Sequence, residues 1–444
     1  MLSTIMMLIG VSALAAPPTS EWRYSGALAR VERGDVRPVK RFEMRFLVVA
    51  DDENRRTITY LTSEDDGAAI AWPERFGRLS SQFEPPQQSG GPPVQVLYRH
   101  QDRPHVLSMP GPVFEHRAKL SANAEWTTDA WRYRVLSEKD VDGVPCWEIE
   151  AVSTGRGGTV TLVVEPATGR IQTGRRRLTL GQGDQFELLW RLDSSRELPV
   201  DEADKAALAA DSLIAMQSAL GREHAGDEPG LSPDQLETVE AALGMLPSQS
   251  ADTMFAPLVA LLAQDVKTQR LRAASVSELS QKFVGQVAPE FALFGLDGKP
   301  IAAEARKGKT LVLHFWEYKD EPLEEPYGQI GYLDFLMNRH SPDTLAVYGV
   351  AVNRRLRDPA SAPAAARAVR RLKSFMNLGY EIAADKDGKV LKAFGDPTQF
   401  DADLPLWVVI APDGKIVHYR TGYYEIDREV GLAEIDAIVT GLER

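Results

Sequence analysis

The stretch Leu311–Leu323 reads L-V-L-H-F-W-E-Y-K-D-E-P-L and decides the fold of the last third of this chain. Its first half is an apolar run that ends in Phe315–Trp316, which predicts a strand buried on both faces. Its second half is acidic and contains Pro322, a residue type that favours the first turn of a helix. We therefore expect a buried strand, then a turn, then a helix.

Outward from this stretch, strand patterns alternate with helix patterns. Strands are predicted at 291–293, 311–315 and 345–352, helices from Pro322, at 363–378 and at 428–442, and a β-hairpin that turns at Asp413–Gly414. Strands that alternate with helices and end in a hairpin and a helix indicate an α/β domain with a mixed sheet.

Three features of this region resemble the redoxin branch of the thioredoxin superfamily, the TlpA-like and AhpC/TSA-like group. They are G-Q-V-A-P-E-F-A-L-F-G-L-D-G-K at Gly285–Lys299, the F-W that ends the buried strand, and Leu404–Pro405 before L-W-V-V-I. The resemblance covers about residues 285–442 and implies a thioredoxin-like domain at 284–444. It also implies a cis bond before Pro405, in a turn that faces the family's active cysteines.

The expected cysteines are absent. We aligned residues 315–323, F-W-E-Y-K-D-E-P-L, with the family motif F-W-x-x-W-C-x-x-C. In this alignment Asp320 and Leu323 stand at the two cysteine positions. Neither a carboxylate nor an isobutyl group replaces the attacking thiolate of thiol–disulfide exchange. The chain's one cysteine, Cys146, lies in a different region, in strand-like sequence that indicates a structural thiol. We expect no catalytic residue and no cofactor, and the acids near Pro322 are predicted to cap a helix.

The remaining chemistry of this region favours binding. The seven histidines show no metal-ligand spacing, and His314 is predicted to be a satisfied buried histidine. The family resemblance implies a surface beside the cis-proline that grips an extended peptide or protein partner. We expect its contact residues to be Trp316, Asp320, Leu323, Leu404 and Pro405.

Residues 21–200 are predicted to form an antiparallel β-rich domain. Apolar and charged residues alternate in Arg41–Phe46, and the pattern recurs at 131–135, 147–150, 159–165, 171–180 and 186–190. One face is apolar and aromatic, so a helix, a second sheet or a bound apolar ligand must cover it. Residues 142–180 resemble the later strands of LolA-like lipoprotein carriers, which implies a half-barrel able to hold an acyl chain. The alternative is an ordinary sheet packed by its own helix.

Residues 201–283 are predicted to be helical, either as a small domain or as a connector. Ser232–Pro233 is a helix start, with Ser as N-cap and Pro at the first helical position. We therefore expect a multi-domain protein, in agreement with a length of 444 residues and a typical domain size of about 150 residues.

The first residues and the net charge indicate the location of the protein and the kind of partner that it does not bind. Within residues 1–16, an apolar run at Ile5–Val11 leads to the small-x-small pattern Ala13-Leu14-Ala15, which predicts a signal peptide and an exported protein, periplasmic or extracellular. The run is too short to span a membrane, and we expect no transmembrane segment elsewhere. A net charge of −12 argues against nucleic-acid binding.

The sequence thus favours an exported, redox-inactive thioredoxin-like protein that acts as a binding or scaffold module. One alternative is an oxidoreductase or peroxidase of the redoxin class that borrows a thiol from Cys146 or from a partner. Another is a lipid or lipoprotein carrier that works through the N-terminal sheet.

Overall fold

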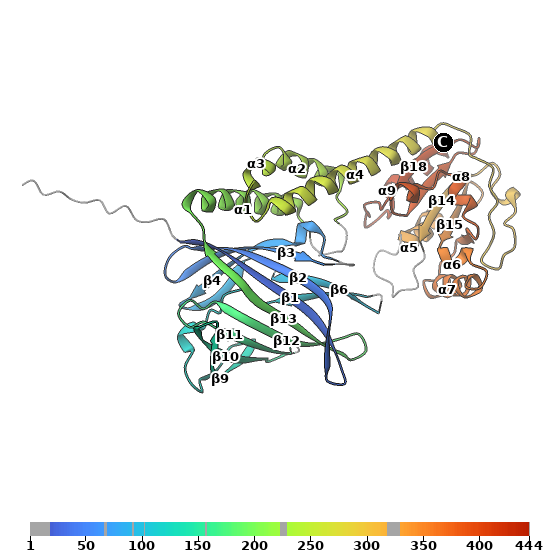
Figure 1. Cartoon of the computed structure of the whole chain (residues 1–444). Helices are drawn as coiled ribbons and strands as arrows, with labels where there is room; N and C mark the ends of the chain where they lie inside the picture. Colours follow the sequence, from blue (N-terminus) through green and yellow to red (C-terminus); the bar gives the residue numbers. More distant parts are fainter. Residues whose placement is uncertain are drawn as a thin grey trace, which may run out of the picture. The chain divides into compact units, whose positions relative to one another are not determined.

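A computed structural model describes residues 18–65, 69–90, 93–101, 103–155, 158–222, 229–317 and 329–443. The chain divides into two compact units, Met1–Val266 and Lys267–Arg444 (Figure 1). The predicted signal peptide at 1–16 lies outside the described residues.

The first unit is built on one large antiparallel sheet, which confirms the β-rich prediction. Its eleven strands run in the order β5-β4-β3-β2-β1-β13-β12-β11-β10-β9-β8, so the first and last strands pair at its centre. The strands are β1 (Thr19–Glu32), β2 (Asp35–Ala50), β3 (Arg55–Glu64), β4 (Phe76–Phe83), β5 (Pro86–Gly90), β8 (Glu125–Thr127), β9 (Trp131–Val141), β10 (Val144–Ser153), β11 (Thr159–Val164), β12 (Ile171–Leu180) and β13 (Asp184–Glu197).

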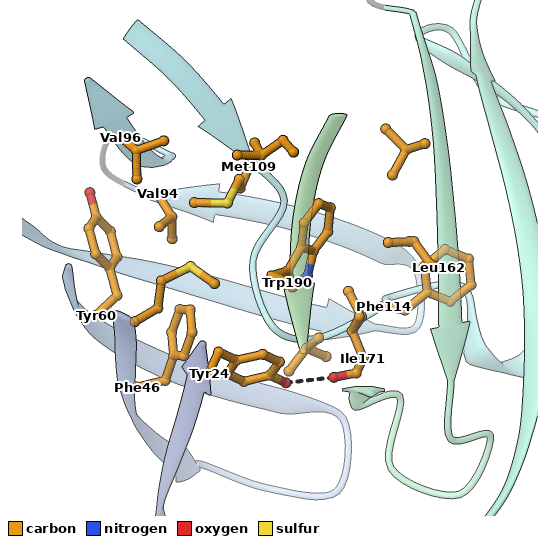
Figure 2. Packing of buried hydrophobic residues seen from close by; sticks show 14 of the residues in the cluster. Tyr24, Phe46, Tyr60, Val94, Val96, Met109, Phe114, Leu162, Ile171 and Trp190 are labelled. Atoms are coloured by element: carbon orange, nitrogen blue, oxygen red, sulfur yellow. Dashed lines mark hydrogen bonds between the residues drawn. The ribbon is translucent and has the colours of Figure 1, made fainter. Parts of the chain in front are cut away.

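The aromatic face of this sheet is covered by the chain itself. A two-stranded hairpin of β6 (Val94–His100) and β7 (Arg103–Met109), together with Phe114, packs against it. Figure 2 shows side chains of the sheet and the hairpin gathered in one interior, where the Tyr24 hydroxyl donates to the Ile171 carbonyl at 2.7 Å. The cover is therefore a second, two-stranded sheet, which is one of the three covers that the sequence left open.

Two glycines let large rings lie flat across the centre of the sheet. Gly26 is paired with Phe42, and Gly174 is paired with Trp190. A Cβ atom at Gly26 would lie 2.1 Å from the Phe42 ring, and one at Gly174 would lie 2.0 Å from the Trp190 ring. Glycine is required at both positions because the neighbouring ring occupies the space of a side chain.

A buried ion pair ties the hairpin to the sheet. Lys40 Nζ lies 2.7 Å from Glu64 Oε2, and the two side chains are 4% and 0% exposed. Glu64 Oε1 also accepts a hydrogen bond of 3.0 Å from the backbone N–H of Leu97, on β6. Glu64 thus joins β2, β3 and β6 through one carboxylate.

Helices pack on the opposite face of β2–β4. They are α1 (Val200–Leu220), α2 (Pro233–Leu243), α3 (Leu246–Ser250) and the first part of α4 (Ala256–Phe283). Ser232 and Gln235 form a capping box at α2, which confirms the predicted helix start. The last part of the predicted helical region 201–283 is one continuous helix, α4. No helix within the described ranges is long and apolar enough to cross a membrane.

The second unit is an α/β domain with a mixed five-stranded sheet in the order β16-β15-β14-β17-β18, as predicted. Strands β14, β15 and β16 are parallel, and β17 and β18 run antiparallel to their neighbours. The strands are β14 (Thr310–Glu317), β15 (Leu345–Val352), β16 (Glu381–Ala384), β17 (Leu406–Ile410) and β18 (Ile416–Thr421).

Helices cover both faces of this sheet. They are α5 (Ile330–Arg339), α6 (Arg354–Arg357), α7 (Ala362–Phe375), α8 (Lys389–Ala393) and α9 (Ala433–Leu442). Side chains of α5, α7 and α9 fill one core, and side chains of α8 and the end of α4 fill the other. Short 3₁₀ turns lie at Trp72–Glu74, Arg117–Lys119, Ala303–Ala305 and Pro397–Phe400.

Two sequence expectations for this unit are wrong. The strand expected at 291–293 is not formed, because this segment pairs only through single bridges such as Phe294 with Pro300. The last helix begins at Ala433 rather than at 428, since Asp427 closes a local turn with Gly431. The helix start expected at Pro322 lies outside the described residues.

Replacing Lys40 by Met should lower the free energy of unfolding of the first unit by about 3–5 kcal/mol, because the Glu64 carboxylate would stay buried without its cation. Urea unfolding followed by tryptophan fluorescence measures the change. Arg37→Met removes a cation from an exposed pair with Asp35 and should cost less than about 0.5 kcal/mol. Equal costs for the two variants would contradict the role assigned to Lys40.

The stability of the first unit should depend on pH through Glu115. Burial raises the pKa of this carboxyl to about 7 from its ordinary 4.5. A hydrogen bond of 3.2 Å from the Ser81 hydroxyl lowers the pKa and so opposes part of this rise. Between these values the folded state binds more protons than the unfolded state, so stability falls as pH rises. Glu115→Gln should therefore gain about 2–3 kcal/mol more, relative to the parent, at pH 8 than at pH 5. Urea midpoints at the two pH values test this, and an identical difference at both would contradict it.

Candidate functional site

The register of two strands brings the two halves of the site together. Phe315, near the end of β14, is paired with Leu406, the first residue of the antiparallel strand β17. The end of β14 and the residues before β17 therefore lie at the same edge of the sheet. The bond between Leu404 and Pro405 is cis, which confirms the sequence prediction.

The predicted contact residues have different surroundings. Asp320 and Leu323 lie in 318–328, outside the described residues. Trp316 is 1% exposed and packs in a core with side chains of α5 and α7. Pro405 is buried and Leu404 is half-buried. Of the three described residues, Leu404 is the most exposed, and Trp316, expected at a surface, lies in the core instead.

Below this edge lies a buried group of aromatic and imidazole rings. His314 is 0% exposed, and its ring centroid is 4.0 Å from that of Trp407. Trp407 Nε1 donates to the Gly422 carbonyl at 3.0 Å, and its ring meets Tyr424 edge-on at 5.3 Å. His314 is thus a buried core residue, as expected.

The Tyr424 hydroxyl is hydrogen-bonded to His418 Nε2. Burial lowers the pKa of the His418 imidazole; the charge of Glu434 opposes this effect and that of Arg420 reinforces it. Burial also raises the pKa of the Tyr424 hydroxyl. Both shifts favour the uncharged forms, so this pair stabilises the domain as a neutral hydrogen bond.

Gln329 fastens the start of α5 to the segment after β18. Its side chain is buried, its Nε2 donates to the Tyr424 carbonyl at 2.7 Å, and its Oε1 accepts from the Tyr424 N–H at 2.9 Å. Gln329 has a left-handed backbone with φ +62°. Sequence reasoning missed this residue, because nothing local distinguishes a glutamine that pairs with a backbone 95 positions away.

The single cysteine lies in the first unit. Cys146 is on β10, paired with Lys139 of β9, and is 3% exposed. Burial raises the pKa of its thiol, and the negative charge of Glu165 adds to the shift. Both effects disfavour the reactive thiolate. Among the residues that the structure describes, no group of three or more His, Cys, Asp or Glu side chains is placed to hold a metal ion.

Comparison with known proteins identifies the second unit. The AhpC/TSA family model matches residues 284–419. The thiol-disulfide oxidoreductase ResA of Bacillus thuringiensis subsp. konkukian is 25% identical over 139 residues, which cover 31% of this chain and 70% of that protein.

Two solved structures are also similar. A thiol:disulfide interchange protein of the thioredoxin family from Chlorobium tepidum is 19% identical, with 35% of this chain and 95% of that chain covered and a TM-score of 0.28. A secreted disulfide oxidoreductase of Mycobacterium tuberculosis is 19% identical, with 34% and 96% covered and a TM-score of 0.26.

The family match does not extend into residues 18–266, so the resemblance of the N-terminal sheet to lipoprotein carriers stays a prediction. In the second unit, the matched sequence, the mixed sheet and the cis-proline agree with one another. The C-terminal part of this chain is a thioredoxin-like domain of the redoxin, AhpC/TSA-like type, related to thiol-disulfide oxidoreductases.

Proposed function

We propose that the C-terminal domain is redox-inactive and binds an extended segment of a partner protein, within a protein that is exported from the cytoplasm. One observation carries the first part: residues 284–419 contain no cysteine. Thiol–disulfide exchange proceeds by attack of a thiolate on a disulfide sulfur, so the domain has no group of its own to start it. Asp320 and Leu323 occupy the aligned cysteine positions.

The binding role is supported by the backbone N–H and C=O groups of Leu404, which we call the Leu404 edge. In the parts of the chain that the structure describes, the backbone N–H and C=O of Leu404 have no hydrogen-bond partner. A backbone edge of this kind pairs with an extended peptide, in the manner of strand addition. This edge precedes β17 and lies beside the end of β14.

The second candidate function is that of a redoxin-class oxidoreductase that uses a thiol from outside the domain. Cys146 is a poor donor, because it is buried and its thiol pKa is raised. The carrier hypothesis has less support, since the chain's own hairpin fills the aromatic face of the first unit.

The full chain should not catalyse reduction of insulin by dithiothreitol, because no exposed thiol is available to relay electrons. Turbidity from precipitated insulin B chain measures the rate, with a cysteine-containing thioredoxin as the positive control. Cys146→Ser should behave like the parent. Activity that disappears in Cys146→Ser would overturn the proposal in favour of the borrowed internal thiol.

The full chain should bind short unstructured peptides through their backbone. Fluorescence anisotropy of labelled ten-residue peptides measures the affinity. N-methylation of the amides along one edge of the best peptide should weaken binding at least about tenfold, since each lost hydrogen bond costs about 0.5–1.5 kcal/mol. Methylation of the amides on the opposite edge is the matched control. Equal effects from both edges would contradict binding by strand addition.

A further inference from the structure

Two chain segments that flank β17 and β18 meet beside the Leu404 edge. The N–H of Gly422 donates to the Pro405 carbonyl at 2.8 Å, so residues 401–405 and 422–426 are joined directly. The second segment is held on both sides of Tyr423. Trp407 Nε1 binds the Gly422 carbonyl, and the Gln329 side chain binds both backbone groups of Tyr424. Tyr423 is thus presented by a fixed backbone.

Burial alternates along both segments. Tyr424 is buried and Ile426 is half-buried, whereas Tyr423 and Glu425 are exposed, Tyr423 to 51%. On the other segment Ala402 is buried, and Asp401 and Asp403 are exposed. The side chains of Asp401, Asp403, Tyr423 and Glu425 are thus open to solvent on these two segments. We call Asp401, Asp403, Tyr423 and Glu425 the acidic aromatic face.

Asp403 and Tyr423 lie two and one positions from Pro405 and Gly422, whose backbones are hydrogen-bonded to each other. Burial raises the pKa of the Tyr423 hydroxyl, and the negative charge of Asp403 raises it further. The backbone link between Pro405 and Gly422 explains this proximity, because it brings the two segments alongside each other.

The charges on this face are uncompensated. Within the described ranges, the carboxylates of Asp401, Asp403 and Glu425 form no ion pair. The nearby cation Arg420 is already engaged, since it pairs with Glu434 at 2.6 Å and lies over the Tyr424 ring at 4.3 Å. An exposed aromatic ring among unpaired carboxylates favours a cation as its neighbour.

We propose that the acidic aromatic face selects an extended peptide segment that carries a lysine or arginine, with the cation over the Tyr423 ring and within reach of Asp403 and Glu425. The inference rests on the proposed peptide-binding function and adds the class of peptide. An acidic segment would meet like charges at this face, and a neutral segment would leave the carboxylates without a partner.

The test uses the full chain and three labelled peptides that are identical except for one central residue, which is Lys, Gln or Glu. At low ionic strength the Lys peptide should bind about fivefold more tightly than the Gln peptide, and the Glu peptide should bind most weakly. The preference should shrink in 1 M salt, where charges are screened over about 3 Å.

Substitutions in the acidic aromatic face distinguish the contribution of the Tyr423 ring from that of the carboxylates. Tyr423→Leu and Asp403→Asn should each reduce the preference for the Lys peptide by about two- to fivefold. Tyr423→Phe keeps the ring and should retain the preference. Glu304→Gln removes an exposed carboxylate elsewhere in the same unit and is the matched control.

The outcomes distinguish this inference from the proposed function. Equal binding of the three peptides, still sensitive to N-methylation on one edge, would overturn the basic preference and leave peptide binding intact. No binding of any peptide would overturn the peptide-binding function itself. A preference for Lys that persists in Tyr423→Leu and in Asp403→Asn would show that the cation is held elsewhere and would contradict the face named here.

Discussion

The pairing of β14 with its two neighbours is the constraint on which the C-terminal domain depends. Residues 310–316 of this strand are buried, which requires a partner strand on each edge and a helical layer on each face. Parallel pairing to β15 and antiparallel pairing to β17 meet these needs, and the second pairing places Leu404–Pro405 beside the end of β14. The candidate site is thus a consequence of strand register.

This architecture is present although residues 284–419 contain no cysteine. The groups beneath the site, His314, Trp407 and Tyr424, are buried and packed together, so the supporting layer is complete without sulfur at the surface. Gln329 adds a fixed link between α5 and the segment after β18. Such a scaffold holds a backbone edge and an exposed Tyr423 in place, which is what recognition of an extended peptide requires.

The first unit stabilises itself in a different way. Its aromatic face is filled by the β6–β7 hairpin, and the carboxylate of Glu64 links that hairpin to the sheet through Lys40 and Leu97. Gly26 and Gly174 leave room for the rings of Phe42 and Trp190. The chain itself therefore fills the aromatic face of this sheet.

Sequence alone determined the two kinds of fold, because alternation in Arg41–Phe46 and the apolar run at Leu311–Phe315 are local patterns that reflect which faces are buried. It also determined the cis bond before Pro405, through the family resemblance, and the absence of cysteine from residues 284–419. Tertiary structure decided what covers each face and which residues meet at the site. Trp316 was expected at a surface and lies in a core, and Gln329 and Tyr424 meet across 95 residues. Contacts of this kind depend on strand register and helix packing between distant segments, which local patterns of polarity do not specify.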